Sequence, residues 1–412
     1  MKICLVTFIY DPKFGGGAAV VAQTLTRELS QAGHRVTVIT TAPTRKIEVV
    51  WDGKVKVIQI PSANLYWVGN KDCQPIWKKV IWQLIDIWNP MIYRLVRQIV
   101  ITEQVDIFHS HKLRGLSPSI WSAAASAGVK RIVHTCHDFE LLSPEGLFMG
   151  KVGRLAQEQN IVMRPYQILR RHFSRLVDQV TSPSRLVLNT HKKMGFFPKA
   201  TTKIIPNTHG YDSGELRQNF LEVSKSPKKE LPRRFLYLGR LDKAKGIDLL
   251  CQAFLRIASQ NPDILLRIAG WGPLDASLRE KYKDQHNIIF TGPVFGAQKA
   301  ELFKDSDVLV APSLAPENFP IVIAEAYAHG LPVITSRAGA FPEIVREGET
   351  GFLVETGSVD HLCSALARVS QDPRLTSAMS ARCIEEAQKY TTEKFIGDYL
   401  ELYRGSLDRR KF

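Results

Sequence analysis

The chain has 412 residues, of which 44% are hydrophobic and 23% are charged, which is an ordinary composition for a soluble globular protein. No run of 18 apolar residues occurs, which excludes a simple transmembrane helix. A chain of this length suits two domains of about 200 residues each.

The net charge of +15 is unevenly distributed. Residues 1–205 hold 28 Lys and Arg against 13 Asp and Glu, whereas residues 206–412 hold 27 of each kind. The whole excess therefore lies in the first half, which we expect to face a membrane surface, an anionic acceptor or nucleic acid.

The cysteines and the first residues indicate a compartment. The six Cys are scattered without a C-x-x-C pair, which argues against a zinc site and a disulfide framework. The start, MKICLVTFIYDPK, lacks a small-residue cleavage site and reads as a strand instead of a signal peptide. We expect a cytoplasmic protein.

The first half alternates strands and helices. Residues 2–10 predict a buried strand, 11–17 a loop, and 18–32 a helix. Further strand-like runs follow: GHRVTVITT, KVKVIQI, VDIFHSH, KRIVHTCHD, QVTSPS and TKIIPN. This alternation predicts an α/β domain with a doubly wound parallel sheet.

The second half repeats the pattern after a polar stretch, 211–234, that reads as a connecting loop. Strand-like runs are RFLYLGR, DILLRIAGWGP, NIIFTGPV, DVLVAPS, LPVITS and TGFLVE, with helical patterns between them. A second doubly wound domain is expected. Ligands of such sheets bind at the carboxyl ends of the strands.

Three glycines, Gly15, Gly16 and Gly17, lie between the first strand and the first helix. Glycine there lets backbone N–H groups approach an anion at the positive end of a helix. The spacing is not G-x-G-x-x-G, and the second strand ends without an acidic residue for a ribose. Both observations argue against a nicotinamide cofactor.

Two cations, Arg240 and Lys245, follow the first strand of the second half. A guanidinium fork and an ammonium point charge at the carboxyl end of a strand suit a diphosphate. The alternative is a pair of solvated loop cations.

Two carboxylates, Glu317 and Glu325, flank the start of an apolar helix predicted over 321–329. An unpaired buried carboxylate is costly, so Glu325 needs a partner. They could be a catalytic pair, acceptors of hydrogen bonds from sugar or ribose hydroxyls, or core residues paired with Arg or Lys. The residues alone leave these alternatives open.

The ordered set of motifs resembles the retaining glycosyltransferase family 4, the group 1 glycosyl transferases. Its E-x(7)-E motif is matched by Glu317 to Glu325, and the resemblance runs through nearly the whole chain: DIFHSH, HTCHDF, TSPS, IIPN, YLGRLDKAKGIDLL, IAGWGP, FTGPV and GAFPEIVREGETGFLV. It implies the GT-B fold, in which two Rossmann-like domains face each other across a cleft. It also implies transfer of a sugar from a nucleotide diphosphate donor with retained configuration, no bound metal and no cofactor.

The resemblance also implies domain roles and site residues. Residues 1–205 would bind the acceptor, with a C-terminal helix of about 393–412 packed back on them, and 206–392 would bind the donor. Arg240 and Lys245 would hold the diphosphate, Glu317 the donor sugar, and Glu325 the ribose, so that the ligand is the partner of Glu325. The other implied donor-side positions are Gly15, Gly16, Gly270, Val294, Asn318 and Phe319.

The implied reaction centre includes His137, which with Arg240, Lys245 and Glu317 makes the catalytic set. His109, His111 and Asp138 are candidates for the acceptor side, although core roles suit the first two equally well. Glu140 and Ser143 stand where related sequences often carry Trp and Cys, so no metal or Cys cluster is expected there.

The stretch 75–100 carries Trp and aliphatic residues at near-helical spacing together with Lys78, Lys79, Arg94 and Arg97. Such a pattern is typical of a core helix, which we favour, and also of a helix lying on an anionic bilayer. Pro90 would bend or interrupt it.

The sequence therefore predicts a glycosyltransferase, a hexosyltransferase of polysaccharide biosynthesis, with UDP, GDP or ADP as the nucleotide. The partners would be a nucleotide sugar, a glycan or lipid-linked acceptor and an anionic membrane surface at its cytoplasmic face. Alternatives are a sugar phosphorylase or a nucleotide-sugar epimerase. A basic nucleic-acid-binding protein is a remote alternative, because no nucleic-acid motif occurs. No nucleic-acid partner is therefore expected.

Overall fold

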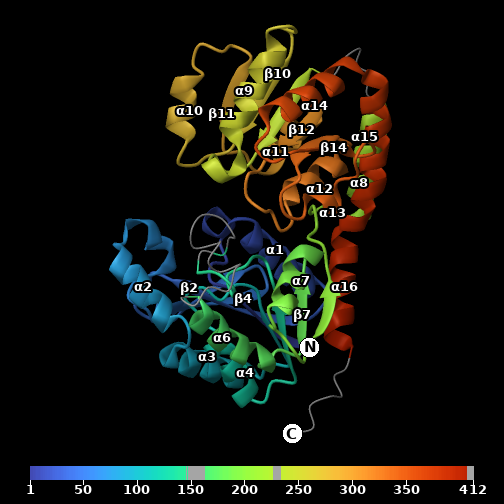
Figure 1. Cartoon of the computed structure of the whole chain (residues 1–412). Coiled ribbons are helices and arrows are strands. Elements are labelled where there is room, and N and C mark those ends of the chain that lie inside the picture. Colours follow the sequence, from blue (N-terminus) through green and yellow to red (C-terminus); the bar gives the residue numbers. More distant parts are fainter. Residues whose placement is uncertain (145, 147–162, 226–232, 406–412) are drawn as a thin grey trace. The chain divides into compact units, whose positions relative to one another are not determined.

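A computed structural model describes residues 1–144, 146, 163–225 and 233–405. The chain forms two compact units, one of residues 1–206 with 395–412 and the other of residues 207–394 (Figure 1). The last seven residues of the expected C-terminal helix, 406–412, lie outside the described part.

The first unit is built on a sheet in the order β3-β4-β2-β1-β5-β6-β7-β8, parallel except for β3 against β4. Helices connect the strands except along β2, β3 and β4, which follow one another directly. The strands are β1 (Lys2–Val6), β2 (Arg35–Ala42), β3 (Glu48–Asp52), β4 (Val55–Pro61), β5 (Ile107–Ser110), β6 (Arg131–Thr135), β7 (Gln179–Ser182) and β8 (Thr201–Ile204). The helices are α1 (Pro12–Gln31), α2 (Ile76–Ile85), α3 (Pro90–Glu103), α4 (Ser119–Ser126), α6 (Arg164–Phe173), α7 (Arg185–Lys193) and most of α16 (Thr392–Arg404).

The second unit has a fully parallel sheet in the order β11-β10-β9-β12-β13-β14. Its strands are β9 (Arg234–Leu238), β10 (Leu265–Ala269), β11 (Ile288–Gly292), β12 (Val308–Ala311), β13 (Val333–Ser336) and β14 (Gly351–Val354). Its helices are α8 (Ser213–Lys225), α9 (Ile247–Ala258), α10 (Asp275–Lys281), α11 (Gly296–Lys304), α12 (Ile321–Ala328), α13 (Phe341–Ile344), α14 (Val359–Gln371) and α15 (Pro373–Ala387).

Burial on both faces explains the sequence of the central strands. β1, β5, β6, β12 and β13 are almost wholly buried, so they lack the alternation of apolar and polar residues of a half-exposed strand. β5 and β6 nevertheless bury the polar residues His109, Arg131 and His134. Each unit has its own hydrophobic core around these strands. The predicted fold class, two doubly wound α/β domains, is confirmed.

Two local predictions were wrong. The stretch 211–234 holds α8, which begins with a reciprocal cap: the Asp212 carboxylate accepts from the Glu215 N–H at 2.7 Å, and the Glu215 carboxylate accepts from the Asp212 N–H at 2.9 Å. That D-x-x-E signal for a helix start was overlooked. Of the loop predicted at 11–17, residues 12–17 belong instead to α1, which is broken at Gly16 with φ of 61°.

The stretch 75–100 forms two helices, α2 and α3, separated at residues 86–89. Pro90 stands at the first turn of α3, and the Asn89 side chain caps it by accepting from the N–H groups of Met91 and Ile92, as expected where proline cannot continue a helix. α3 buries Ile92, Val96 and Ile99. The favoured core interpretation is therefore right for α3, but α2 leaves most of its apolar residues exposed.

The described part of the chain contains no helix that is both long enough and apolar enough to cross a membrane.

Candidate active site

The donor residues predicted in the second unit converge on one edge of its sheet. β9 lies between β10 and β12, all three parallel, so their carboxyl ends meet. Arg240 follows β9, Gly270 follows β10, and the segment 312–320 follows β12. This is the edge at which doubly wound sheets bind ligands.

Lys245 and Glu317, which belong to separate motifs, form one ion pair. The Lys245 Nζ lies 2.5 Å from Glu317 Oε1, and the Ser313 hydroxyl donates to the same oxygen at 2.7 Å. The Asp242 side chain accepts from the Lys245 N–H at 3.2 Å and fixes the turn that presents the lysine. The two side chains are 33% and 17% exposed, so the pair remains within reach of a ligand.

Arg240 lies beside this pair on the same loop and is more open to solvent. Its Nε is 3.2 Å from Asp242 Oδ2, and its guanidinium carbon is 5.8 Å from the centre of the Trp271 ring. The carboxylate engages Nε, and the guanidinium has further N–H groups. The arrangement leaves donors of Arg240 for an anion.

Glu325 has a protein partner that sequence reasoning missed. Lys299 of α11 places its Nζ 2.5 Å from Glu325 Oε1, with side chains 27% and 15% exposed. The expectation that the partner of Glu325 is the ligand is therefore incomplete, because the fold itself neutralises this carboxylate. Lys299 stands 26 residues upstream, and no motif or spacing connected it to Glu325.

Three glycines hold the backbone of this edge close together. A Cβ on Gly270 would lie 1.8 Å from the Gly239 carbonyl oxygen, and one on Gly246 would lie 2.1 Å from that of Pro312. At Gly339 a Cβ would lie 2.3 Å from both the N and the O of Glu317. All three have positive φ. Gly339 therefore fixes Glu317 through backbone packing, which only glycine allows.

The other predicted donor positions differ in exposure. Phe319 is buried and packs edge-on against Tyr390, with ring centres 5.5 Å apart. Its side chain therefore anchors the segment 312–320 to the core of the second unit. Val294, after β11, is partly buried against the same core. Asn318 is partly exposed.

A cavity of about 510 Å³ lies beside this edge, between α9 and α10. Asp242, Gly246, Asp248, Lys281 and Leu314 contribute to its lining. None of the predicted donor residues lines it.

In the first unit the carboxyl ends of β5 and β6 bring histidines together. The Nδ1 of His111 lies 2.8 Å from the Nε2 of His137, and His111 is buried whereas His137 is partly exposed. Burial lowers the pKa of both rings well below the ordinary value, and the nearby Lys112 charge lowers that of His137 further. Both rings are therefore neutral near pH 7, so that one donates and the other accepts.

His109 occupies a different environment in the interior. Its ring nitrogens lie 2.6 Å from the Tyr403 hydroxyl and 2.7 Å from the Thr135 hydroxyl, and it is fully buried. Tyr403 belongs to α16. Two roles were open for His109, one on the acceptor side and one in the core. The structure places it in the core, where its hydrogen bonds link α16 to the sheet.

Asp138 follows His137 and forms an ion pair with Lys112. Burial would raise the pKa of Asp138, but the charges of Lys112 and Arg114 outweigh it and hold this pKa below its ordinary value. Glu140, two residues on, is buried and accepts from the Leu113 N–H at 2.7 Å. Burial, followed by the Asp138 charge, raises the pKa of Glu140 to about 7.

Gly15 and Gly16 lie at the start of the same unit, just after β1. Gly16 breaks α1 with φ of 61° and ψ of −155°, and a Cβ there would meet nothing within 4 Å. The glycine is required by backbone conformation and not by crowding. The break lies between β1 and the regular part of α1, where an anion-binding turn was predicted.

Among the described residues no group of three or more His, Cys, Asp and Glu side chains is arranged to hold a metal ion. The candidate residues of the second unit are joined by ion pairs, and those of the first unit include hydrogen-bonded imidazoles.

Two family models match the chain and together span most of it. Glycosyltransferase Family 4 matches residues 15–209, and Glycosyl transferases group 1 matches residues 219–390. The chain belongs to this family of glycosyltransferases, and it is therefore an enzyme.

Individual relatives extend over the same range. An uncharacterized 42.6 kDa protein of the cps region of Klebsiella pneumoniae is 28% identical and covers 84% of this chain and 88% of its own. A phosphatidyl-myo-inositol mannosyltransferase of Mycobacterium leprae is 26% identical, and the alignment covers 77% of this chain and 78% of the relative. The crystal structure of Anabaena Alr3699/HepE in complex with UDP aligns with a TM-score of 0.68 at 19% identity, over 98% of this chain and 99% of that one, which shows a shared fold.

Proposed function

We propose that the protein moves a hexose from a nucleotide diphosphate sugar to a glycan or lipid-linked acceptor, with retained anomeric configuration and without a bound metal. The observation that carries this proposal is the Lys245–Glu317 ion pair beside Arg240 at the carboxyl edge of the second sheet. Two cations and a carboxylate there match the charges of a diphosphate and the hydroxyls of a sugar.

The cations would act on the leaving group. When the bond from sugar to diphosphate breaks, negative charge develops on the diphosphate, and positioned positive charges stabilise it. Arg240 can bind a phosphate through two N–H groups, whereas Lys245 contributes a point charge. These residues supply the charge stabilisation that a metal ion supplies in other enzymes.

In this proposal Lys245 exchanges Glu317 for a phosphate of the donor. A partly exposed ion pair is worth only about 0.2–1 kcal/mol, so this exchange costs little compared with a charge-assisted bond to phosphate. Glu317, once released, has carboxylate oxygens free to accept hydrogen bonds from donor-sugar hydroxyls. Glu325, held by Lys299, would accept from the ribose hydroxyls in the same way.

His137 is assigned to the reaction centre, with His111 and Asp138 on the acceptor side. Because His111 contacts His137 at 2.8 Å and both pKa values are lowered by burial, the His137 ring is neutral and its orientation is fixed. A neutral imidazole can orient a hydroxyl of the substrate without adding charge.

The acceptor is proposed to be a growing glycan or a lipid-linked sugar of polysaccharide biosynthesis, reached at the cytoplasmic face of a membrane. The excess of 15 positive charges in residues 1–205 favours an anionic acceptor or surface. The M. leprae relative, named for mannosyl transfer to phosphatidyl-myo-inositol, supports a lipid acceptor.

The test is calorimetric titration with UDP, GDP and ADP in the presence of a chelator. We expect one nucleotide to bind and Arg240→Ala to weaken it at least tenfold, since hydrogen bonds to charged groups are worth about 1.5–3 kcal/mol. Arg256→Ala is the matched control, because Arg256 is similarly exposed and also pairs with an aspartate, Asp360. Binding unchanged by Arg240→Ala, or absent for all three nucleotides, contradicts the donor assignment.

Product analysis then distinguishes the reactions of this fold. A transferase forms a glycoside and releases nucleoside diphosphate in phosphate-free buffer. Product formation that requires inorganic phosphate would indicate a phosphorylase, and an isomerised donor would indicate an epimerase.

A further inference from the structure

Helix α2 presents its apolar side chains to solvent, which is the reverse of the usual arrangement. Five of its ten residues are apolar and 40–80% exposed: Ile76, Trp77, Val80, Ile81 and Leu84. Their spacing puts them on one side of the helix. Trp88 and Met91, which follow, are also exposed. We call the five residues of α2 the α2 stripe.

The charged residues of α2 itself have a single sign. α2 contains Lys78 and Lys79 and no acidic residue. No ion pair of either lysine occurs among the described residues, and the Lys78 ammonium lies 5.6 Å from the centre of the Trp77 ring. The next acidic residue, Asp86, is buried and already paired. The exposed face of α2 is therefore apolar and cationic.

The opposite side of α2 is fixed to the unit by Trp82. This residue is buried, and its indole N–H donates to the Tyr66 carbonyl at 3.0 Å. Its own carbonyl accepts from the Asn64 side chain at 3.1 Å. These bonds orient the helix through its inner side.

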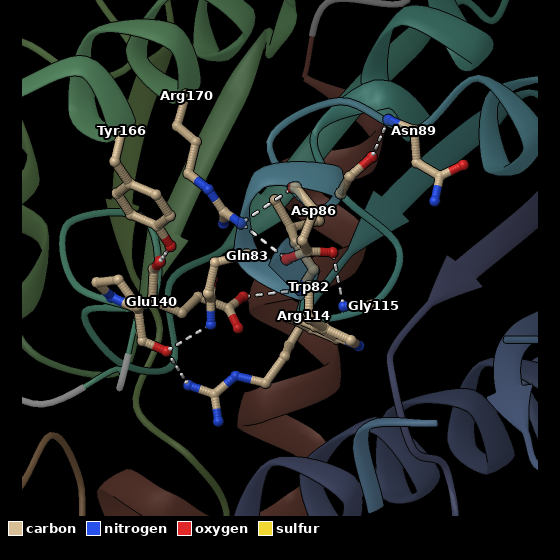
Figure 2. Close-up of polar contacts among 12 residues, drawn as sticks. Trp82, Gln83, Asp86, Asn89, Arg114, Gly115, Glu140, Tyr166 and Arg170 are labelled. Carbon is tan, nitrogen blue, oxygen red and sulfur yellow. Dashed lines mark hydrogen bonds and ion pairs between the residues drawn. The ribbon is translucent and has the colours of Figure 1, made fainter. Parts of the chain in front are cut away.

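The end of α2 is held by a buried ion pair, shown in Figure 2. Asp86 accepts from Arg170 of α6 at 2.8 Å and from the Gly115 N–H at 2.9 Å, and Arg170 lies 4.4 Å from the centre of the Tyr166 ring. The Tyr166 hydroxyl donates to the Glu140 carbonyl at 2.7 Å. Rolling α2 to bury the stripe would break this network and expose its buried charges, so the outward orientation is built into the fold.

We propose that the α2 stripe docks on an anionic lipid bilayer, with Trp77 and its apolar neighbours in the interface and Lys78 and Lys79 against the headgroups. Helices with this composition lie in the bilayer interface, and each basic residue near an anionic surface adds to the attraction. The docking goes beyond donor chemistry. It also deepens the proposed function by placing the acceptor at a lipid surface. This statement about the acceptor rests on the proposed function, whereas the docking of α2 does not.

A second copy of the chain is a poorer occupant on two grounds. Two copies would bring together units that each carry the excess of 15 positive charges, whereas an anionic bilayer complements that charge. In addition, a ten-residue helix is about 15 Å long, which is short for the roughly 800 Å² per partner of a stable interface.

The first experiment is co-sedimentation of the full chain with phosphatidylcholine vesicles with and without phosphatidylglycerol, at low and high salt. We expect binding to the anionic vesicles that weakens with salt. Trp77→Ser with Leu84→Ser should weaken it about 100-fold, since burying each large apolar side chain contributes strongly. Lys78→Gln with Lys79→Gln should weaken it about 30-fold.

Matched controls distinguish binding by the α2 stripe from nonspecific hydrophobic binding and from an effect of net charge alone. Trp51→Ser removes a tryptophan that is 65% exposed on β3 of the same unit. Lys192→Gln with Lys193→Gln removes an adjacent exposed lysine pair on α7. Both should retain vesicle binding within about threefold. Equal losses in test and control variants would overturn the assignment to α2.

Two further outcomes would overturn docking: no sedimentation of the wild type at low salt, or a dimer in sedimentation velocity without lipid that Trp77→Ser with Leu84→Ser dissociates. Thermal melting and nucleotide titration of each variant check the fold. Nucleotide binding without vesicle binding refutes docking alone. Vesicle binding without nucleotide binding refutes the proposed function and leaves docking standing.

Discussion

The two units contain ion pairs of opposite character. Asp86 and Arg170 in the first unit are each 2% exposed and are paired with each other (Figure 2), whereas Lys245–Glu317 and Lys299–Glu325 in the second are partly open. A fully buried pair holds secondary-structure elements in place, because removing one partner leaves a buried charge unpaired. A partly open pair at a strand end can exchange its partner for a ligand. Exposure, more than residue type, therefore separates a structural pair from a binding pair.

The buried pair should give the largest effect. Arg170→Met leaves Asp86 without its cation, and we expect the free energy of unfolding of the first unit to fall by about 3–5 kcal/mol. Hydrogen exchange of peptides from α2, α3 and α6 would measure it. Arg171→Met, at the exposed neighbouring position, is the control and should change stability by no more than about 0.5 kcal/mol. Equal effects of the two changes would contradict the structural role.

The histidines of the first unit predict a loss of stability in acid. Burial lowers the pKa of His191 from 6.5 to about 4, so the unfolded chain takes up the proton first as the pH falls. The stabilising contribution is complete above pH 6.5 and is lost towards pH 4, by about 3 kcal/mol for this residue. Hydrogen exchange of α7 at several pH values measures it, and His191→Phe should remove that part of the dependence.

The contribution of Glu140 to stability depends on pH with the opposite sign and must be measured separately. Burial raises its pKa from 4.5 to about 7, so its contribution is present below pH 4.5 and is lost as the pH rises through 7. Glu140→Gln should therefore flatten the decline on the alkaline side while leaving the acid loss due to His191. An acid loss that persists unchanged in His191→Phe would contradict the assignment to that histidine.

Lys245→Ala tests the binding role of the open pair. We expect nucleoside diphosphate affinity to fall by about 10- to 150-fold, because a hydrogen bond to a charged group is lost, with a stability change below about 1 kcal/mol. Titration calorimetry and denaturant unfolding measure the two quantities. Lys281→Ala, which breaks a more exposed lysine–carboxylate pair with Asp248, should leave affinity intact. A large stability loss in Lys245→Ala would make this pair structural as well.

Glu317→Gln should give the smallest and most diagnostic change. Releasing Lys245 from its carboxylate partner should let the bare nucleoside diphosphate bind up to about fivefold more tightly, given the modest worth of a partly exposed pair. Sugar transfer should nevertheless be lost, since the donor sugar loses a contact. Calorimetry and a transfer assay measure the two effects, and weaker nucleotide binding would contradict the exchange of partners.

Much of the architecture follows from the sequence because the buried parallel strands are short, rich in β-branched and apolar residues, and separated by helical patterns. Arg240, Lys245 and Glu317 could be placed at strand ends for the same reason, and the carboxyl ends of adjacent strands meet. Lys299 could not be found, because a lysine on an amphipathic helix carries no sign of the carboxylate that it faces. The periodicity of 75–100 revealed an apolar side but not the direction in which that side points. In α2 that direction is set by Trp82 and Asp86, whose partners are distant in sequence.

The glycines of the donor edge limit how this enzyme can change its specificity. Because Gly246, Gly270 and Gly339 have backbone atoms where a Cβ would stand, these positions cannot acquire a side chain that would reshape the pocket. Selection for a new donor, in nature or in a library, therefore has to act at neighbouring positions that already carry side chains, such as Val294 and Asn318. The glycines keep the backbone next to Arg240, Lys245 and Glu317 fixed, and variation is confined to the positions around them.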